Sequence, residues 1–193
     1  VDAFRTRSAL VQDPRIGKIA IAGWSLGGTV ALYSAWSPII EILGGPFDAH
    51  LPFYPAAHIR PEIQKWSESP ILILHGDADD WTPLHLVEGL IPQLPNATLQ
   101  VYPGAHHSFD GEKELTFLPK AVRLRKRTAK IDKNGYMSGQ LFLGIRLPLN
   151  ERWQRRWIIR LLRNRGAHVE GNPAARADSL ERAKQFLIGK IGD

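Results

Sequence analysis

The sequence of 193 residues contains no cysteine and only one methionine. The lack of cysteine excludes disulfide bonds, thiolate metal ligands and a cysteine nucleophile. It does not indicate in which cellular compartment the protein lies. Apolar runs are short, far from the roughly 20 residues that a transmembrane helix requires. With 44% hydrophobic and 23% charged residues, the composition is that of a globular protein with one sizeable core.

Positive charge is concentrated in one part of the chain. Residues 111–165 contain 15 Lys and Arg against 4 Asp and Glu, so they carry about +11, whereas the whole chain carries +6. This stretch also interrupts an alternation of strand-like and helix-like segments. An Asn-Gly pair at 134–135, between strand-like halves, predicts a hairpin. We therefore expect a basic insertion at about 111–165.

The most informative segment reads Gly-Trp-Ser-Leu-Gly-Gly over residues 23–28, after an apolar run at 19–22 and before a helix-like run at 29–36. A Gly-x-Ser-x-Gly turn between a strand and a helix is typical of a nucleophile elbow, which raises a serine hydroxyl above the end of a sheet. The flanking glycines suit a turn too tight for side chains. Ser25 is then a candidate nucleophile, and the alternative is an ordinary turn serine. The Leu26 N–H, at the start of the helix, is a candidate oxyanion donor.

Two more polar segments follow predicted strands. The apolar run 71–74 ends in the acid-rich segment 75–83, and the strand-like run 98–102 ends in a histidine-containing loop at 103–110. Because the carboxyl ends of parallel strands meet at one edge of a sheet, we expect an acid and a histidine to join Ser25 there. The order Ser, acid, His along the chain is that of α/β-hydrolases. The sequence therefore favours an α/β fold with a mostly parallel sheet.

These motifs resemble those of the dienelactone hydrolase family, over most of residues 1–110 and again over roughly 166–190. The resemblance implies an α/β-hydrolase-type sandwich that hydrolyses small-molecule carboxylic esters without a cofactor. The family pattern places the acid at Asp79 and the histidine at His107, with Ser25 as nucleophile. Dienelactone hydrolase itself has a cysteine at the nucleophile position, so the resemblance favours an acyl ester over a dienelactone as substrate. The segments that carry the likeness are residues 23–28, 47–55, 75–79, 102–110 and 171–177.

The neighbours of the candidate acid and histidine receive other roles. We expect Asp77 and Asp80 to cap the following turn or to face water. His106 is expected to be a loop residue beside His107, and His75 a hydrogen-bonded structural residue at the end of a strand. The adjacent histidines make a poor metal site, because neighbours in an extended loop point in opposite directions. The sequence therefore predicts no metal.

The beginning of the chain carries a further expectation. It opens with Val1 inside a helix-like segment, whereas an α/β-hydrolase has several strands before its nucleophile. We expect residues 1–193 to form a single, partial α/β-hydrolase domain, truncated at its N-terminus, with one exposed sheet edge. One of the absent loops would supply the second oxyanion N–H. Residues 59–69 are expected to be a loop, and residues 84–90 a helix.

A basic helix is expected after Asn150, which is a candidate N-cap. We favour a solvated arginine face over an apolar packing stripe. Docking on an anionic membrane surface is the second interpretation, and contact with nucleic acid is the last, because no recognised binding motif accompanies the charge. The apolar residues that share one helix face are Trp153, Trp157, Ile158, Leu161 and Leu162, and the surrounding arginines are Arg152, Arg155, Arg156, Arg160 and Arg163.

Two other functions stay open. A serine peptidase of the prolyl-oligopeptidase type resembles the Gly-Trp-Ser-x-Gly-Gly and His-Gly-x-x-Asp motifs of this chain. A non-catalytic binding module would use the basic segment, with the core as its scaffold. The segment Ala-His-His-Ser-Phe-Asp at 105–110 and the short chain favour the esterase.

Overall fold

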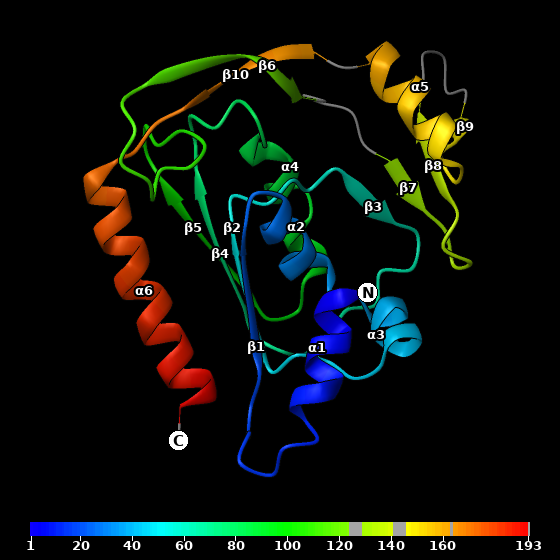
Figure 1. Cartoon of the computed structure of the whole chain (residues 1–193), viewed down its shortest axis with the longest axis vertical. Helices are drawn as coiled ribbons and strands as arrows, with labels where there is room; N and C mark the ends of the chain where they lie inside the picture. Colours follow the sequence, from blue (N-terminus) through cyan, green and yellow to red (C-terminus); the bar gives the residue numbers. More distant parts are fainter. Residues whose placement is uncertain (124–128, 141–145, 163, 193) are drawn as a thin grey trace.

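The structure is a computed structural model that describes residues 1–123, 129–140, 146–162 and 164–192. Its centre is a four-stranded sheet in the order β1-β2-β4-β5 (Figure 1), in which all neighbouring strands are parallel. The predicted α/β fold with a mostly parallel sheet is confirmed. The four strands are β1 (Ala20–Trp24), β2 (Ala49–Phe53), β4 (Ile71–Gly76) and β5 (Ala97–Tyr102).

Helices cover both faces of this sheet. Because side chains alternate along a strand, Ile71 and Ile73 of β4 pack in one core cluster with residues of α2 (Leu26–Tyr33) and α4 (Leu84–Glu88). Leu72 and Leu74 pack in a second cluster with residues of α6 (Pro173–Ile191). The strand β4 is buried throughout, which explains its unbroken apolar sequence.

Two further α-helices and one short 3₁₀ helix lie within the first 93 residues. Helix α1 (Asp2–Leu10) is attached through Phe4, whose ring meets Phe47 edge-on at 5.3 Å. The other two are helix α3 (Ser37–Leu43) and the short 3₁₀ helix η1 (Ile91–Gln93). Strand β1 lies at one edge of the central sheet of the described chain, where Ala22 and Trp24 are exposed.

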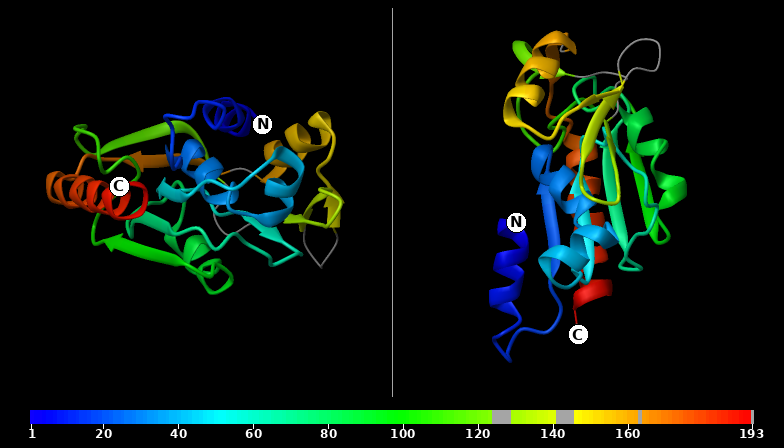
Figure 2. Two further views of the ribbon diagram at one scale, coloured as in Figure 1. Left: turned by 90° about the horizontal axis from the view of Figure 1, so that it is seen from below. Right: turned by 90° about the vertical axis from the view of Figure 1, so that its right-hand side faces the viewer.

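The basic segment contributes strands to two further sheets, seen at the top and at the right of Figure 1 and from two further sides in Figure 2. Strands β6 (Thr116–Arg123) and β10 (Asn164–Val169) pair as a two-stranded ribbon. A second sheet has the order β3-β7-β8-β9. The predicted hairpin corresponds to the antiparallel pair β7–β8, with Gly135 in the left-handed region at a φ of 81°. The bounds in this sheet are Ile59–Pro61 for β3, Ala129–Ile131 for β7, Met137–Gln140 for β8 and Arg146–Pro148 for β9.

The structure corrects two predictions about where elements begin. The predicted loop at 59–69 contains β3, which pairs with β7 in parallel and thereby reaches across about 70 residues of sequence. The helix α5 (Arg152–Leu162) begins one residue too late for Asn150 to be its N-cap. Gln154 Oε1 instead accepts a hydrogen bond from the Glu151 backbone N–H at 2.9 Å, as in a capping box, and Asn150 Oδ1 accepts one from Met137 N–H at 2.8 Å.

The apolar stripe predicted for α5 is also wrong for the two tryptophans. Trp153 is 68% exposed and Trp157 is 60% exposed. The side chains of Arg155, Ile158, Leu161 and Leu162, and residue Arg163, lie outside the described residues.

Candidate active site

The turn between β1 and α2 has the backbone expected of a nucleophile elbow. Ser25 has a φ of 51° and a ψ of −113°, which is a strained conformation for a residue with a side chain. Its backbone N–H donates to Phe53 O on β2 at 3.1 Å, which ties the turn to the neighbouring strand. A Cβ on Gly23 would lie closer than 3.0 Å to the backbone of Gly27, and a Cβ on Gly28 closer than 3.0 Å to Phe53 O. Glycine is therefore required at both positions.

The structure brings the three predicted side chains together at the carboxyl ends of β1, β4 and β5. His107 Nε2 lies 2.9 Å from Ser25 Oγ, and His107 Nδ1 lies 2.7 Å from Asp79 Oδ2. His107 is 2% exposed and Asp79 is 4% exposed, whereas Ser25 is half-buried. With the ring proton on Nδ1, the imidazole donates to the carboxylate and accepts from the serine hydroxyl.

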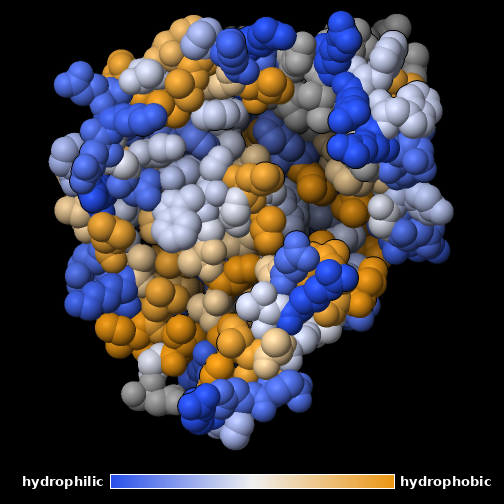
Figure 3. Space-filling model, viewed as in Figure 1, coloured by the Kyte–Doolittle hydropathy of each residue, from blue (hydrophilic) through white to orange (hydrophobic). Residues whose placement is uncertain are grey.

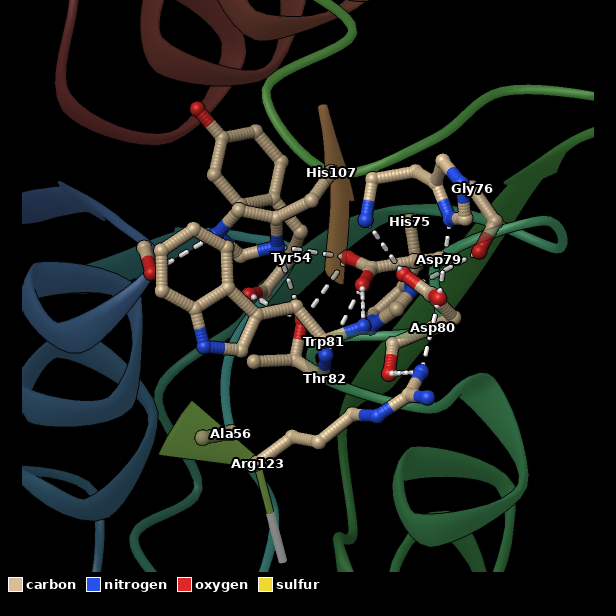
Figure 4. A network of polar contacts seen from close by, with 12 residues as sticks. Tyr54, Ala56, His75, Gly76, Asp79, Asp80, Trp81, Thr82, His107 and Arg123 are labelled. Atoms are coloured by element: carbon tan, nitrogen blue, oxygen red, sulfur yellow. Dashed lines mark hydrogen bonds and ion pairs between the residues drawn. The ribbon is translucent and has the colours of Figure 1, made fainter. Parts of the chain in front are cut away.

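The carboxylate of Asp79 is held by several donors (Figure 4). Its Oδ1 accepts hydrogen bonds from the backbone N–H groups of Trp81 and Thr82, both at 2.8 Å. Its Oδ2 accepts one from the Thr82 hydroxyl, also at 2.8 Å. Thr82 Oγ1 lies in addition 3.2 Å from His107 Nδ1. These contacts fix the carboxylate so that Oδ2 faces the imidazole.

Sequence reasoning missed Thr82. Its place three residues after Asp79 was the available signal, because an Asp side chain commonly accepts backbone N–H bonds from the residues that follow it in a turn.

Two aromatic rings enclose the imidazole (Figure 4). The ring centroid of Tyr54 lies 4.7 Å from that of His107, and the ring centroid of Trp81 lies 4.9 Å from it. The Tyr54 hydroxyl donates to Asp110 Oδ1 at 2.7 Å, and burial above all raises the pKa of this phenol. The Tyr54 side chain is therefore uncharged at physiological pH, and its ring lines one side of the site.

Asp77 and Asp80 have distinct partners. Asp77 is exposed, as predicted for a residue that faces water, and its Oδ1 accepts a hydrogen bond at 2.7 Å from Gly104 N–H in the turn after β5 rather than in the turn that follows Asp77. Asp80 differs from the prediction, because its Oδ2 lies 2.7 Å from Arg123 Nη1 of β6 and its Oδ1 accepts from His168 N–H of β10 at 2.8 Å. These contacts outweigh the burial of the carboxyl and leave the pKa of Asp80 below its ordinary value. The ribbon thus holds the loop that carries Asp79.

The same ribbon contacts the histidine loop. Val169 of β10 forms an isolated bridge with His107, and Glu170 N–H donates to His107 O at 3.2 Å. The histidines beside the candidate acid and base, His75 and His106, are separate from the hydrogen-bonded chain. His75 is fully buried with Nδ1 2.9 Å from Gly76 O, and burial above all lowers its pKa. His106 Nε2 lies 3.9 Å from Glu170 Oε2.

The N-terminus of α2 faces the space next to Ser25. Leu26 is the first residue of that helix, and its N–H therefore has no carbonyl partner within the helix.

Across the described part of the chain, no group of three or more His, Asp or Glu side chains is arranged to hold a metal ion. The described helices include none that is long and apolar enough to cross a membrane.

A serine hydroxyl next to an imidazole that a buried carboxylate orients is an arrangement for nucleophilic catalysis. The model of the dienelactone hydrolase family matches residues 2–132, which is more than half of the chain. The chain belongs to the dienelactone hydrolase family. A comparison with curated proteins gave no match.

Solved structures of several esterases are similar to this member of the dienelactone hydrolase family. Esterase PE8 has 26% identity and a TM-score of 0.36, with 46% of this chain and 41% of that chain covered. Est1E from Butyrivibrio proteoclasticus, with ferulic acid bound, has 20% identity and a TM-score of 0.43, covering 55% and 58%. Esterase 2 of Thermogutta terrifontis has 16% identity and a TM-score of 0.45, covering 87% and 54%. The chain thus spans less than two thirds of each of these proteins, and its family membership rests on the family model.

Proposed function

We propose that this chain carries the catalytic residues of a serine hydrolase that cleaves carboxylic esters. The observation that carries the proposal is the hydrogen-bonded chain Ser25–His107–Asp79, with distances of 2.9 Å and 2.7 Å. Membership of the dienelactone hydrolase family supports the same reaction class. No step of the proposed reaction requires a cofactor.

In the proposed reaction Ser25 Oγ attacks the ester carbonyl while His107 Nε2 accepts the hydroxyl proton. The imidazolium that forms is stabilised by the carboxylate of Asp79. The negative charge that develops on the carbonyl oxygen is stabilised by the Leu26 N–H at the positive end of α2. His107 then protonates the leaving alkoxide, and an alcohol departs from the acyl-enzyme.

Water completes the cycle by the same steps. His107 accepts a proton from a water molecule as that water attacks the acyl carbon, and then returns the proton to Ser25 Oγ as the acid leaves. The rings of Tyr54 and Trp81 support this role, because they hold the imidazole in one orientation throughout the transfer.

We further propose that residues 111–165 are an insertion within a single domain. The ribbon supports this proposal: β6 lies within the segment and contacts Asp80 through Arg123, and β6 pairs with β10. Residues of β10 just after the segment, His168 and Val169, contact Asp80 and His107 in the two loops that carry the acid and the base. The insertion then has a structural role at the catalytic edge of the sheet.

The experiment is hydrolysis of a small chromogenic ester by the wild-type protein and by Ser25→Ala. We expect the variant to lose at least ~10³-fold in kcat/KM, because the proposed acyl-enzyme forms on Ser25 Oγ, which alanine lacks. Circular dichroism would show that the variant is folded. Retention of most of the ester hydrolysis by folded Ser25→Ala would refute the proposal, and cleavage of a peptide amide in place of the ester would change the substrate class.

A further inference from the structure

The outward side of α5 carries tryptophan and arginine together. We call the set Arg152, Trp153, Arg156, Trp157 and Arg160 the α5 outer face. Every member is exposed, and the two tryptophans are 68% and 60% exposed. Indole rings of this size are normally buried at least in part. Two exposed tryptophans one helical turn apart therefore indicate a surface that another molecule covers when the protein functions.

Helical spacing arranges these residues in two adjacent rows. Trp153 and Trp157 are four residues apart and so lie one above the other. Arg152, Arg156 and Arg160 follow the same spacing and form a second row, offset by about 100° around the helix axis. The helix lies at the periphery of the molecule in both views of Figure 2. Both rows can therefore meet a flat surface at the same time.

The tryptophan row borders an apolar groove. Trp153 and Trp157 line a shallow depression of about 170 Å³ together with Leu147, Pro148 and Gln154. The described arginines of the same helix, Arg152, Arg156 and Arg160, are all exposed, so the side of α5 next to the groove is basic. Figure 3 shows strongly hydrophilic side chains gathered over the part of the surface where α5 lies in Figure 1.

We propose that the α5 outer face docks on the surface of an anionic lipid bilayer. Tryptophan is the side chain best suited to the boundary between headgroups and acyl chains, since its ring is apolar and its N–H is polar. A row of arginines beside it matches anionic headgroups in charge. A second copy of this chain fits less well, because a two-fold contact would bring the arginine rows of both copies, which have like charge, into one interface. The proposal is independent of the proposed function.

The test is co-sedimentation with vesicles of phosphatidylcholine alone and of phosphatidylcholine mixed with phosphatidylglycerol. We expect binding to the mixed vesicles only, weakened by added salt. Arg156→Glu with Arg160→Glu should lower the partition coefficient at least about tenfold. Trp153→Ala with Trp157→Ala should lower it by about tenfold and should remove the blue shift of tryptophan fluorescence on binding.

Helix α6 offers matched controls at the opposite end of the molecule (Figure 1). Lys184→Glu with Lys190→Glu makes the same change in net charge, and Leu180→Ala with Ile188→Ala removes two exposed apolar side chains. Both pairs should bind the mixed vesicles as the wild type does. Equal binding to the two kinds of vesicle, an equal loss in the α6 controls, or binding of the wild type to single-stranded nucleic acid but not to vesicles would overturn the proposal.

Discussion

Asp79 is the residue on which the orientation of His107 depends. Its carboxylate accepts the Nδ1–H of the imidazole at 2.7 Å and is itself held by three further donors. We expect Asp79→Asn to lower kcat for ester hydrolysis by ~10³-fold or more, because an amide favours the wrong imidazole tautomer and cannot stabilise the imidazolium. Steady-state kinetics on the chromogenic ester would measure this loss.

Asp77 provides the matched control for that change. Its Oδ1 accepts only a backbone N–H from Gly104 among the contacts described, and the amide oxygen of Asn can accept the same bond. Asp77→Asn should therefore leave kcat within about threefold of the wild type. A loss in Asp77→Asn that equals the loss in Asp79→Asn would contradict the assignment of the acid.

At the residue scale, the sequence predicts the groups whose signals are local. That Ser25, Asp79 and His107 lie together could be predicted, because each follows the end of a strand-like run within a few residues. The contacts of Asp80 could not, since its partners Arg123 and His168 lie 43 and 88 residues away in sequence. No pattern near Asp80 distinguishes a carboxylate paired with a distant arginine from one that faces water.

The elbow illustrates how an element constrains its residues. A Cβ on Gly28 would lie closer than 3.0 Å to Phe53 O, whereas a Cβ on Gly27 would meet no atom within 4 Å. We expect Gly28→Ala to lower the free energy of unfolding by about 2–4 kcal/mol, because α2 must move away from β2. Chemical denaturation followed by circular dichroism would measure the change.

Gly27→Ala is the control in the same helix. It should leave the protein as stable as the wild type or stabilise it by about 0.5–1 kcal/mol, since alanine is the better helix former. If both substitutions cost the same free energy, the close approach of α2 to β2 would not be what requires glycine at residue 28.

Elements with periodic or apolar sequences were predictable, and elements that depend on distant pairing were not. Strand β4 is recognisable because its first four residues are an unbroken apolar run, and it is buried throughout. The three residues of β3 form a strand only because β7 pairs with them, so residues 59–61 carry no signal of their own. The sequence of α5 is amphipathic, but it does not show which face of the helix packs against the rest of the protein. The exposure of Trp153 could therefore not be predicted.

The stability of the whole molecule should depend on pH through a buried histidine. His50 on β2 is fully buried, with Nδ1 2.9 Å from Ala31 O of α2. Burial lowers its pKa from 6.5 to about 4, against the opposing effect of that hydrogen bond. Between these values the unfolded chain binds the proton that the folded chain refuses, so stability is lost as the pH falls from about 6.5 towards 4.

The expected loss from His50 is about 2 kcal/mol of unfolding free energy between pH 7 and pH 5. The comparison is made with His50→Asn, whose amide can still donate to Ala31 O but does not titrate. Urea denaturation at the two pH values should show a smaller loss for the variant than for the wild type, even if the variant is less stable at both. Equal losses in the two proteins would show that other groups account for the pH dependence.

At the scale of the whole molecule, the sequence predicts the layered core but not the arrangement of the basic segment. The core follows from alternating apolar strands and helices, which leave few ways to bury both faces of β4. The path of residues 111–165 follows instead from pairings such as β6 with β10, which join residues about 40–50 apart. Such contacts depend on the assembled fold rather than on local composition.

The central claim is that Ser25 is a nucleophile activated by His107. The most direct measurement is mass spectrometry of peptides after the folded protein reacts with a fluorophosphonate, which phosphonylates base-activated serines far faster than ordinary ones. We predict one adduct, on the peptide that contains Ser25, and none in Ser25→Ala or in protein unfolded before the reaction. An unlabelled Ser25 in the folded protein, or an adduct on another serine of the wild type, would contradict the claim.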